Sequence, residues 1–270
     1  ASLNYISLAG TVQAGATDRP VQLCANGAFT ATGTSDVYGG VQAQTIAKTG
    51  QAAVHGQETL SSAGLPAAPI DLAPLVAAYA SSNDNARIAA HISASGALNL
   101  ASQTTLEITT GVYFLNGLVI DGGASLVAKG KVQLLINGPV KIAGSSSVNS
   151  AGPAANLYLF IAASTTMTVL GTASAVTRIY APSSRLELGG GARLALCAYV
   201  REAQLHGTAL ALGSGDALPV ALASKGGTTA AAASALALGG PDGAFKLGEV
   251  YAFPNPAVKG QVPTIHVEAG

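Results

Sequence analysis

The stretch from Gly111 to Leu212 contains three similar apolar runs, which follow one another at an interval of roughly twenty residues: Asn156-Leu157-Tyr158-Leu159-Phe160-Ile161-Ala162, Val176-Thr177-Arg178-Ile179-Tyr180-Ala181-Pro182 and Leu194-Ala195-Leu196-Cys197-Ala198-Tyr199-Val200. A second series alternates with them: Met167-Thr168-Val169-Leu170-Gly171, Leu186-Glu187-Leu188-Gly189 and Ala203-Gln204-Leu205-His206-Gly207. Alternation of apolar and polar side chains that ends in glycine is typical of a strand and its turn. Two strand series at one period therefore predict a parallel β-helix.

The composition also favours a solenoid. The 270 residues include 33 Gly and no Trp, and 49% are hydrophobic while only 10% are charged. A solenoid has a narrow interior that stacks small and β-branched side chains, and its corners need tight turns. The turns of this chain are irregular, whereas left-handed coils follow a stricter short repeat. We therefore predict an all-β fold, a right-handed parallel β-helix.

The first sixty residues repeat the same unit. Residues 49–56 align with residues 32–39 at one offset, so that Gly50 falls on Gly33 and His55 on Tyr38. We expect residues 1–60 to form an earlier part of the solenoid, with the first 21 residues as its first strand or as a cap. The place of His55 in the repeat explains this residue without a catalytic role.

One short helix interrupts the strands. Leu65-Pro66-Ala67-Ala68-Pro69 is a proline-stiffened connection, and Asp71 is a good N-cap residue before Pro74 in the first turn. Apolar residues then recur at helical spacing: Leu72, Leu75, Val76 and Tyr79. This pattern predicts a helix within residues 70–82 that packs on the side of the β-helix, or, as the second possibility, in a groove of a partner.

Strands return after this helix, beginning with His91-Ile92-Ser93, and residues 143–155 form the widest corner, which we expect to protrude as a loop. The β-helix is predicted to span residues 1–218. Residues 219–247 are an Ala/Gly-rich linker. Residues 248–270 form two strands with a proline-rigid bend between them.

The charges are balanced and scattered, with 13 basic and 13 acidic residues. The absence of a basic stripe excludes nucleic acid as a partner. No apolar run approaches the length of about 20 residues that spans a bilayer. The chain begins at Ala1 without a visible signal peptide, which is compatible with export after its removal.

The sequence predicts no metal and no cofactor. Cys24 and Cys197 lie far apart, so we expect two free, buried thiols rather than a disulfide bridge. The histidines stand alone and read as surface or turn residues rather than ligands: His55, His91, His206 and His266.

Several β-helix proteins cleave polysaccharides, which requires two or three clustered carboxylates, or a Ca²⁺ cage with a basic residue. Asp121, Glu187 and Glu202 are the best candidates, but no acid pair recurs at one coil period. The chain also has no nucleophile elbow, no phosphate loop and no His-Glu-x-x-His motif. We therefore predict that it has no enzymatic activity.

Ice binding is another use of flat β-helix faces, and it calls for a regular threonine ladder. The chain has threonine-rich segments, but they do not fall at one spacing: Thr30-Ala31-Thr32, Thr104-Thr105, Thr109-Thr110 and Thr165-Thr166-Met167-Thr168. The sequence therefore does not favour this function.

Residues 20–218 resemble a little-characterised family of bacterial exported β-helix domains, found in surface, adhesin-like and pilus-associated proteins. The resemblance is carried by four segments: Gly39-Gly40, His55-Gly56, Leu65-Pro66 to Leu72, and the run from Gly111-Val112-Tyr113 to Ile179-Tyr180-Ala181-Pro182. It implies export to the cell surface and implies no catalytic residues.

Residues 248–270 look like the beginning of a small Ig-like module at the C-terminus of many secreted bacterial proteins, including type IX secretion sorting modules. Residues 250–256 match its opening strand and residues 263–267 its next strand, and the later strands are missing. Two strands alone are marginal in water. We expect them to fold back on the β-helix or to add to a neighbouring subunit, through Val250, Tyr251, Phe253, Pro254, Pro256, Ile265 and Val267.

The sequence thus predicts a non-enzymatic, exported structural protein of the bacterial cell surface. It would assemble with itself into an extracellular fibre or sheath through the tail and the ends of the β-helix, as head-to-tail contacts allow. The alternative is an adhesin or glycan-binding module with exposed tyrosines: Tyr38, Tyr113, Tyr158, Tyr180 and Tyr199. A polysaccharide-active enzyme is the third hypothesis. An aromatic row on one flank favours the binder, clustered carboxylates favour the enzyme, and capped ends argue against the fibre.

Overall fold

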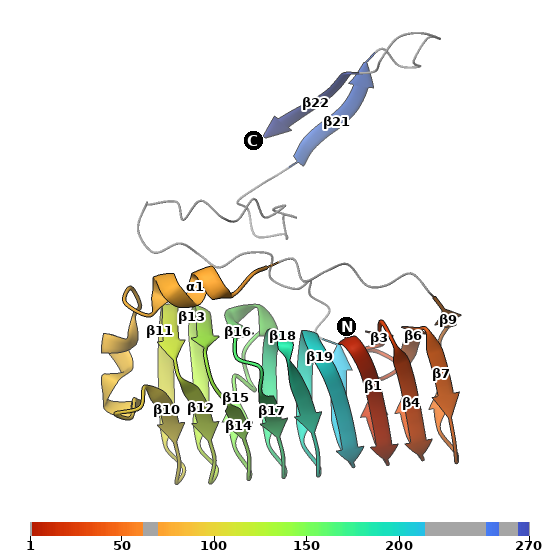
Figure 1. Ribbon diagram of the computed structural model, residues 1–270, viewed down its shortest axis with the longest axis horizontal. Helices are drawn as coiled ribbons and strands as arrows, with labels where there is room; N and C mark the ends of the chain where they lie inside the picture. Colours follow the sequence, from red (N-terminus) through yellow and green to blue (C-terminus); the bar gives the residue numbers. More distant parts are fainter. Residues whose placement is uncertain (1, 62–69, 214–246, 254–263, 270) are drawn as a thin grey trace. The chain divides into compact units, whose positions relative to one another are not determined.

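The structure, a computed structural model, describes residues 2–61, 70–213, 247–253 and 264–269. Its contacts divide the chain into two compact units, residues 1–233 and 234–270, and each is described by itself. The larger unit is a right-handed parallel β-helix, as predicted (Figure 1). Each coil contributes strands to three faces.

Face 1 and face 2 belong to one 17-stranded sheet. Face 1 stacks, in order, β10 (Ala97–Leu100), β12 (Gly117–Ile120), β14 (Val140–Ile142), β17 (Thr166–Val169), the ends of β18 (Ser174–Leu188) and β19 (Arg193–Gly207), β1 (Ser2–Gly10), β4 (Ala28–Gly33) and β7 (Thr45–Lys48). Face 2 stacks the starts of β11 (Thr105–Leu115) and β13 (Ser125–Ile136), β15 (Ser147–Val148), the starts of β18 and β19, β20 (Leu210–Gly213), β2 (Gln13–Ala14), β5 (Asp36–Val37) and β8 (Ala53–Val54).

Face 3 is built in two parts. The first part stacks the ends of β11 and β13, β16 (Leu157–Ile161) and the middle segments of β18 and β19. The second part is a separate three-stranded sheet of β3 (Val21–Cys24), β6 (Gly39–Ala43) and β9 (Glu58–Leu60). The predicted runs at residues 156–162, 176–182 and 194–200 stack one coil apart, with residues 158–160, 178–180 and 197–199 in register on face 3, which confirms the period read from the sequence.

The coils do not follow the order of the sequence. β1 pairs with β19 on one side and with β4 on the other, and β2 lies between β20 and β5 (Figure 1). Residues 2–61 therefore extend the solenoid beyond its last C-terminal coil. The prediction that they form an earlier part of it, with the first strand at its end, is wrong. A parallel ladder needs matching register and continuous apolar columns, and neither requires continuity of the chain.

Inward-pointing side chains form columns through this junction. One column holds, in stacking order, Leu98, Leu118, Val140, Met167, Leu186, Ala203, Ile6 and Phe29, all of them buried. Strand alternation places every second residue inside, so the polar residues between them point outward. The core of residues 2–61 is thus continuous with that of the other coils.

Glycines form a matching column at the corner between face 1 and face 2: Gly144, Gly171, Gly190, Gly207, Gly10, Gly33 and Gly50. Gly33 has a φ of +77°, and a β-carbon there would lie 2.6 Å from the carbonyl oxygen of Gly10. Only glycine adopts this conformation without strain and allows so close an approach. The turns predicted from glycine are therefore confirmed, and they are in register across the coils.

Helix α1 (Ala73–Tyr79) lies along face 3, over β11 and β13 (Figure 1). It is shorter than the predicted span of residues 70–82. The N-cap residue is Leu72 rather than the predicted Asp71, whose carboxylate accepts a hydrogen bond from the backbone nitrogen of Ala73 at 3.0 Å. The amide of Asn83 donates to the carbonyl of Tyr79 at 2.8 Å and closes the other end. Leu72 and Tyr79 are buried against face 3, so the prediction of packing on the side of the β-helix is confirmed.

The end of the solenoid at β10 and β11 is capped. The 3₁₀ helix η1 (Asn85–His91) covers it and buries Ile88. Asp84 and Asn85 bind the backbone of the edge strand: the nitrogen of Val112 donates to Asp84 Oδ2 at 3.0 Å, and that of Phe114 donates to Asn85 Oδ1 at 3.1 Å. The strand predicted at residues 91–93 is wrong, because His91 ends η1 and Ile92 makes only an isolated bridge.

The opposite end, formed by β7, β8 and β9, has a polar layer. Lys48 stands above Ala31 and Glu58 above Val41, both of which are fully buried. Lys48 and Glu58 thus occupy core columns, and they form an ion pair across the interior. Inward-pointing charges and polar terminal repeats are the usual means by which β-proteins block edge pairing. Leu60 remains 71% exposed beside them.

The wide corner at residues 143–155 is only partly a loop. β15 (Ser147–Val148) continues face 2 within it, and η2 (Ala154–Asn156) leads back to β16. Asn149 is buried between them with a φ of +51°, and its amide donates to the carbonyls of Pro153 and Val176 at 2.9 and 3.0 Å. The hydrogen bonds of the buried Asn149 therefore hold this corner against the β-helix, so that it protrudes less than predicted.

The second unit contains two antiparallel strands, β21 (Leu247–Phe253) and β22 (Thr264–Ala269). Val250 lies opposite Val267, and Phe253 lies opposite Thr264. The two strands predicted for the tail are present and pair with each other. Most of the predicted linker, together with Pro254 and Pro256, lies outside the described residues. The assembly role of this tail stays a prediction.

Candidate functional site

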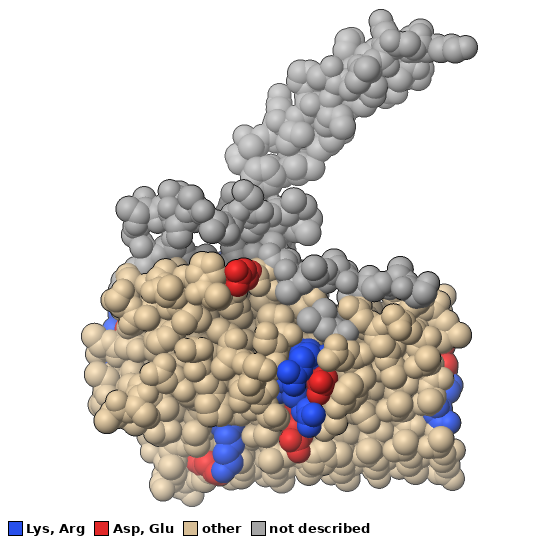
Figure 2. Space-filling model, in the orientation of Figure 1, with Lys and Arg blue, Asp and Glu red and all other residues tan. Residues whose placement is uncertain are grey.

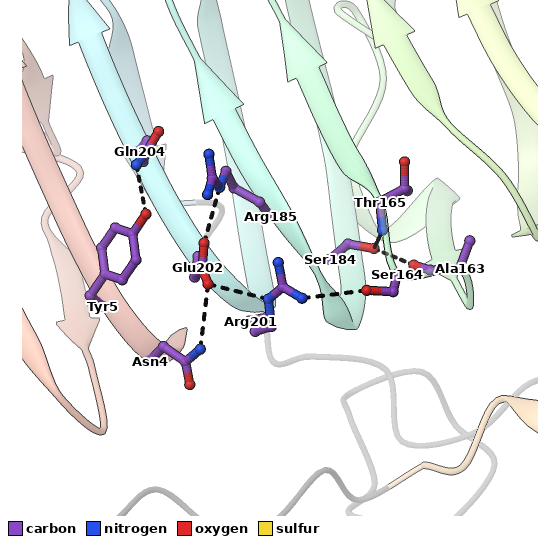
Figure 3. Close-up of polar contacts among 10 residues, drawn as sticks. All are labelled: Asn4, Tyr5, Ala163, Ser164, Thr165, Ser184, Arg185, Arg201, Glu202 and Gln204. Atoms are coloured by element: carbon purple, nitrogen blue, oxygen red, sulfur yellow. Dashed lines mark hydrogen bonds and ion pairs between the residues drawn. The ribbon is translucent and has the colours of Figure 1, made fainter.

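Face 1 carries the most concentrated group of charged side chains in this view of the molecule, near its middle (Figure 2). The group lies where β1 meets β19. We call it the seam cluster, and it comprises Asn4, Tyr5, Arg185, Arg201, Glu202 and Gln204 (Figure 3). Strand register explains the grouping, because Arg185, Glu202 and Tyr5 are direct neighbours on three adjacent coils.

Glu202 is the centre of the seam cluster. Its Oε2 lies 3.0 Å from Nε of Arg185, and its Oε1 lies 3.3 Å from Nε of Arg201. The amide of Asn4 also donates to Oε1, at 3.5 Å. The Glu202 side chain is 13% exposed, whereas each arginine side chain is 38% exposed. The carboxylate is therefore held underneath, and the guanidinium groups are the part that solvent or a partner can reach.

The electrostatics of Glu202 follow from these contacts. Burial raises its pKa, and the hydrogen bonds from Arg185 and Asn4, with the two arginine charges, lower it more strongly. The pKa of Glu202 therefore lies below its ordinary value. Glu202 also raises the pKa of Arg185 through their hydrogen bond. This glutamate is an ionised anchor at neutral pH and a poor proton donor.

One further polar contact lies within the seam cluster and another lies beside it. The amide of Gln204 donates to the hydroxyl of Tyr5 at 2.6 Å, which joins β19 to β1. Nε2 of His206 lies 3.1 Å from Oε1 of Glu187 on the neighbouring coil. The contact of His206 joins β19 to β18, whereas the contacts of Tyr5 with Gln204 and of Asn4 with Glu202 hold the N-terminal strand β1 to β19.

The three carboxylates predicted as the best catalytic candidates all lie on face 1, and each is paired with a base one coil away. Asp121 binds Lys141 at 2.8 Å, and this hydrogen bond and that from the nitrogen of Gly122 lower its pKa. Glu187 binds His206, and Glu202 binds Arg185. The structure does not gather the three into one group, since their partners lie on different coils. Each of these three described carboxylates thus contacts a basic side chain, and they do not form the pair of carboxyl groups that glycoside cleavage needs.

The tyrosines predicted as glycan contacts have different positions. Tyr158, Tyr180 and Tyr199 form a row on face 3 with Phe160, in which the rings of Tyr180 and Tyr199 stack at 5.5 Å. Tyr180 and Tyr199 are buried in the cluster that contains α1, and burial raises the pKa of both.

The other two predicted tyrosines lie elsewhere. Tyr113 is fully buried in the core. Tyr38 lies on face 2 and stacks on the ring of His55, which also contacts Asp36 at 2.9 Å. The aromatic row therefore exists, but most of its rings are buried and contribute to packing rather than to an exposed surface.

Metal and thiol chemistry find no support. Within the described parts of the chain, no group of three or more His, Cys, Asp and Glu side chains is placed to hold a metal ion. Cys24 and Cys197 are not joined by a disulfide, and both are half-buried rather than buried as predicted. The helices of the described residues include none that is long and apolar enough to cross a membrane.

A family described as a domain of unknown function, DUF7305, matches residues 71–209, which is more than half of the chain. The chain belongs to the DUF7305 family. The match falls inside the region whose resemblance to exported β-helix domains was noted from the sequence. The family description names no activity, so export and surface location stay predictions.

Among solved structures, the chain is similar to the ice-binding protein of an Antarctic ascomycete, Antarctomyces psychrotrophicus. The two are 15% identical over 80% of this chain and 93% of that chain, with a TM-score of 0.36. A likeness at this level carries no conclusion about function. No curated protein matches the chain.

The two ends of the DUF7305 region are covered in different ways in this structure. The region begins with α1 and with η1, the second of which caps the end of the solenoid at β10 and β11, and it ends just after β19. The edge of β19 is covered by β1, which lies outside the matched residues. The seam cluster is therefore the contact between the DUF7305 region and the N-terminal coils.

A column of hydroxyl side chains, which the sequence reading missed, runs along the corner of the DUF7305 coils and continues onto the N-terminal coils. Its members each follow a turn glycine and are exposed: Ser145, Thr172, Thr208, Thr11 and Thr34. Gly191 interrupts it. Thr172 and Thr208 donate to carbonyls of the preceding coil, and Thr34 donates to Thr11 at 3.1 Å. Reading the residue after each turn glycine would have found this column.

A groove of about 640 Å³ lies beside α1 of the DUF7305 region. Its described lining mixes apolar and polar residues: Ile70, Asp71, Leu72, Ala73, Val76, Asn137, Ala162, Pro182 and Ser183. Asp71 is the only ionisable residue among them, and its carboxylate already accepts a hydrogen bond from the nitrogen of Ala73, the first residue of α1. The groove offers room for a small ligand but no pair of groups for acid–base chemistry.

Proposed function

We propose that the protein is a non-enzymatic, exported structural protein of the cell surface, in which the β-helix serves as a rigid rod. The observation that carries the proposal is the use of ionisable side chains as rungs between adjacent coils. Five pairs, each 17 to 22 residues apart in the chain, have this arrangement: Asp121–Lys141, Glu187–His206, Arg185–Glu202, Glu107–Lys129 and Asp36–His55.

Pairing of this kind supports a structural role over a catalytic one. A glycoside-cleaving site needs one carboxyl group that holds a proton and a second that is free to act as base or nucleophile. Asp121 and Glu202 instead have lowered pKa values and cationic partners, and Glu187 contacts a histidine. The same contacts tie neighbouring coils together, as a rod requires.

The caps refine the assembly hypothesis. Asp84 and Asn85 occupy backbone groups at one end, and Lys48 and Glu58 end the apolar core at the other. These features argue against simple end-to-end stacking of solenoids. Assembly through the C-terminal tail remains a separate prediction.

Two measurements test the proposal. Purified protein is incubated with neutral and acidic polysaccharides, and we expect no new reducing ends and no unsaturated products from the wild type or from Glu187→Gln and Glu202→Gln. Turnover by the wild type that Glu202→Gln abolishes would refute the non-enzymatic role. Antibody labelling of intact and lysed cells of the source organism tests the location, and labelling only after lysis would contradict export.

Glycan binding at the seam cluster is the second candidate function. The partly exposed guanidinium groups of Arg185 and Arg201, together with Gln204 and Tyr5, present hydrogen-bond donors and one ring on face 1. Affinity electrophoresis in gels that contain polysaccharide tests it. We expect Arg185→Ala to abolish retardation, while Lys141→Ala, which removes a comparable rung cation on the same face, leaves it unchanged. Equal retardation of both variants and the wild type would exclude the cluster.

A further inference from the structure

The solenoid consists of two blocks that are joined by one short stretch of chain. The N-terminal block is residues 2–61, and the main block is residues 70–213. They meet along β1–β19 and β2–β20, where the nitrogens of Thr11 and Gln13 donate to the carbonyls of Gly207 and Ala209 at 2.8 and 2.9 Å. The seam cluster adds side-chain contacts across the same junction. The contact between the blocks is thus an extensive ladder.

Both ends of the connecting stretch are anchored on described residues. The nitrogen of Ser61 donates to the carbonyl of Ala43 at 3.0 Å. Ile70 is held on the main block, because its nitrogen donates to the hydroxyl of Tyr180 and its carbonyl accepts from it, both at 2.9 Å. Counted on face 1, the coil of Tyr180 and the coil of Ser61 are five ladder steps apart, from β17 through β18, β19, β1 and β4 to β7.

Chain length makes closure within one molecule demanding. Strands in a sheet are about 4.8 Å apart, so five steps separate the anchors by about 24 Å along the solenoid axis. The nine Cα–Cα steps from Ser61 to Ile70 reach at most about 32 Å when fully extended. Little slack remains, and short connections under such constraint favour exchange of the connected element between copies.

We infer that the N-terminal block is exchangeable, and that its second binding place is the β19–β20 edge of another copy of this chain. The exchanged ladder would keep every contact of the closed form, since Ile6 and Leu8 would continue the columns of Ala203 and Leu205 in either case. The caps at the two far ends leave this internal junction as the surface at which two copies fit. The inference rests on the order of the coils and does not depend on the proposed function.

Cross-linking of mixed chains tests the exchange directly. Ser7 and Gln204 are register partners on β1 and β19, within reach of a disulfide. Full-length Ser7→Cys and Gln204→Cys chains, both also carrying Cys24→Ala and Cys197→Ala, are unfolded, refolded together and oxidised. We expect a covalent heterodimer. A matched mixture of Ser7→Cys and Thr168→Cys chains should give none, because Thr168 lies on the same face three coils from Ser7. Absence of the Ser7–Gln204 heterodimer, with the double variant forming the internal disulfide, would overturn the inference.

Length variants provide a second readout by light scattering after size-exclusion chromatography. Deletion of residues 64–67 leaves five Cα–Cα steps, which reach at most about 18 Å and cannot bridge about 24 Å. We expect this variant to be dimeric or larger at all concentrations, and insertion of eight Gly/Ser residues at the same place to shift the population toward monomer. A folded deletion variant that is monomeric would refute the exchange.

Discussion

The glycine column makes a sharp prediction, because two neighbouring glycines of one turn should respond oppositely to the same substitution. Gly190 has a φ of +67°, and a β-carbon there would lie 2.9 Å from the carbonyl oxygen of Gly171 on the preceding coil. Gly191 has no such backbone conformation, and its β-carbon would lie 3.6 Å from the nearest atom, Oγ1 of Thr208. Gly191→Ala is therefore a matched control for Gly190→Ala.

The magnitudes follow from these two geometries. Alanine in the left-handed region costs about 1–2 kcal/mol, and relieving a close contact with rigid backbone adds about 1 kcal/mol, so we expect Gly190→Ala to lose about 2–3 kcal/mol of unfolding free energy. At Gly191 the substitution only restricts the unfolded chain, which stabilises by about 0.4–1 kcal/mol. The two variants should thus differ by about 3 kcal/mol, or roughly 6–12 °C in Tm for a domain of this size.

Urea unfolding followed by circular dichroism measures the difference, with thermal scans as a check, because solenoids can unfold in more than one step. A loss of ellipticity that begins at lower urea in Gly190→Ala alone would agree with the structure. If the variants unfold within about 0.5 kcal/mol of each other, the coils are not stacked as closely at this corner as the structure places them.

Three other substitutions test separate features. Glu202→Gln should lower the unfolding free energy by about 1 kcal/mol at neutral pH. Because folding lowers the pKa of Glu202, the stability difference between wild type and variant should be complete above pH 4.5, the ordinary pKa, and should shrink in urea titrations at lower pH. A constant difference down to pH 3 would contradict the anchor role. The double variant Lys48→Leu/Glu58→Leu should have an apolar end and form larger particles in light scattering, while Lys48→Gln/Glu58→Gln stays dispersed. The same particle size for both variants would show that the ion pair does not block association at this end. Tyr180→Phe should cost about 1–3 kcal/mol in urea unfolding, because it leaves the nitrogen and carbonyl of Ile70 without their partner, and an unchanged stability would show that Ile70 is anchored otherwise.

The strands of the main block could be predicted because their alternation and terminal glycines are local signals. The run from Leu194 to Val200 stacks one coil beyond the run from Val176 to Pro182, as its spacing implied. Helix α1 could be predicted equally well, since Leu72 and Tyr79 lie on one apolar stripe and pack on face 3. Periodicity of apolar residues reports which side of an element is buried, and it does so without knowledge of the partner.

The order of the coils could not be predicted in this way. The columns that join Leu205 to Leu8, and Gly207 to Gly10, link residues almost 200 positions apart, and nothing local distinguishes this pairing from others. The 3₁₀ helix η1 could not be predicted for a similar reason, because its residues cap an edge strand and follow neither a strand period nor a helix period. Its Asp84 and Asn85 act on backbone groups of residues 112 and 114, a contact that depends on the tertiary fold alone.

The candidate site could not be predicted from the sequence because the coils differ in length. Asp121, Glu187 and Glu202 look isolated in the sequence because their partners stand 20, 19 and 17 residues away, on the next coil. In a solenoid the neighbour of a charge is found one coil away rather than three or four residues away, and that distance changes with every corner. A charge scan by coil would have paired all three acids and would have placed two of the pairs between β18 and β19, next to the seam with β1. Many of the scattered charges of this chain are therefore rungs between neighbouring coils. The junction that the exchange of N-terminal blocks would have to open lies beside such rungs, and it is joined by the backbone ladder and by the uncharged side chains of Asn4 and Tyr5.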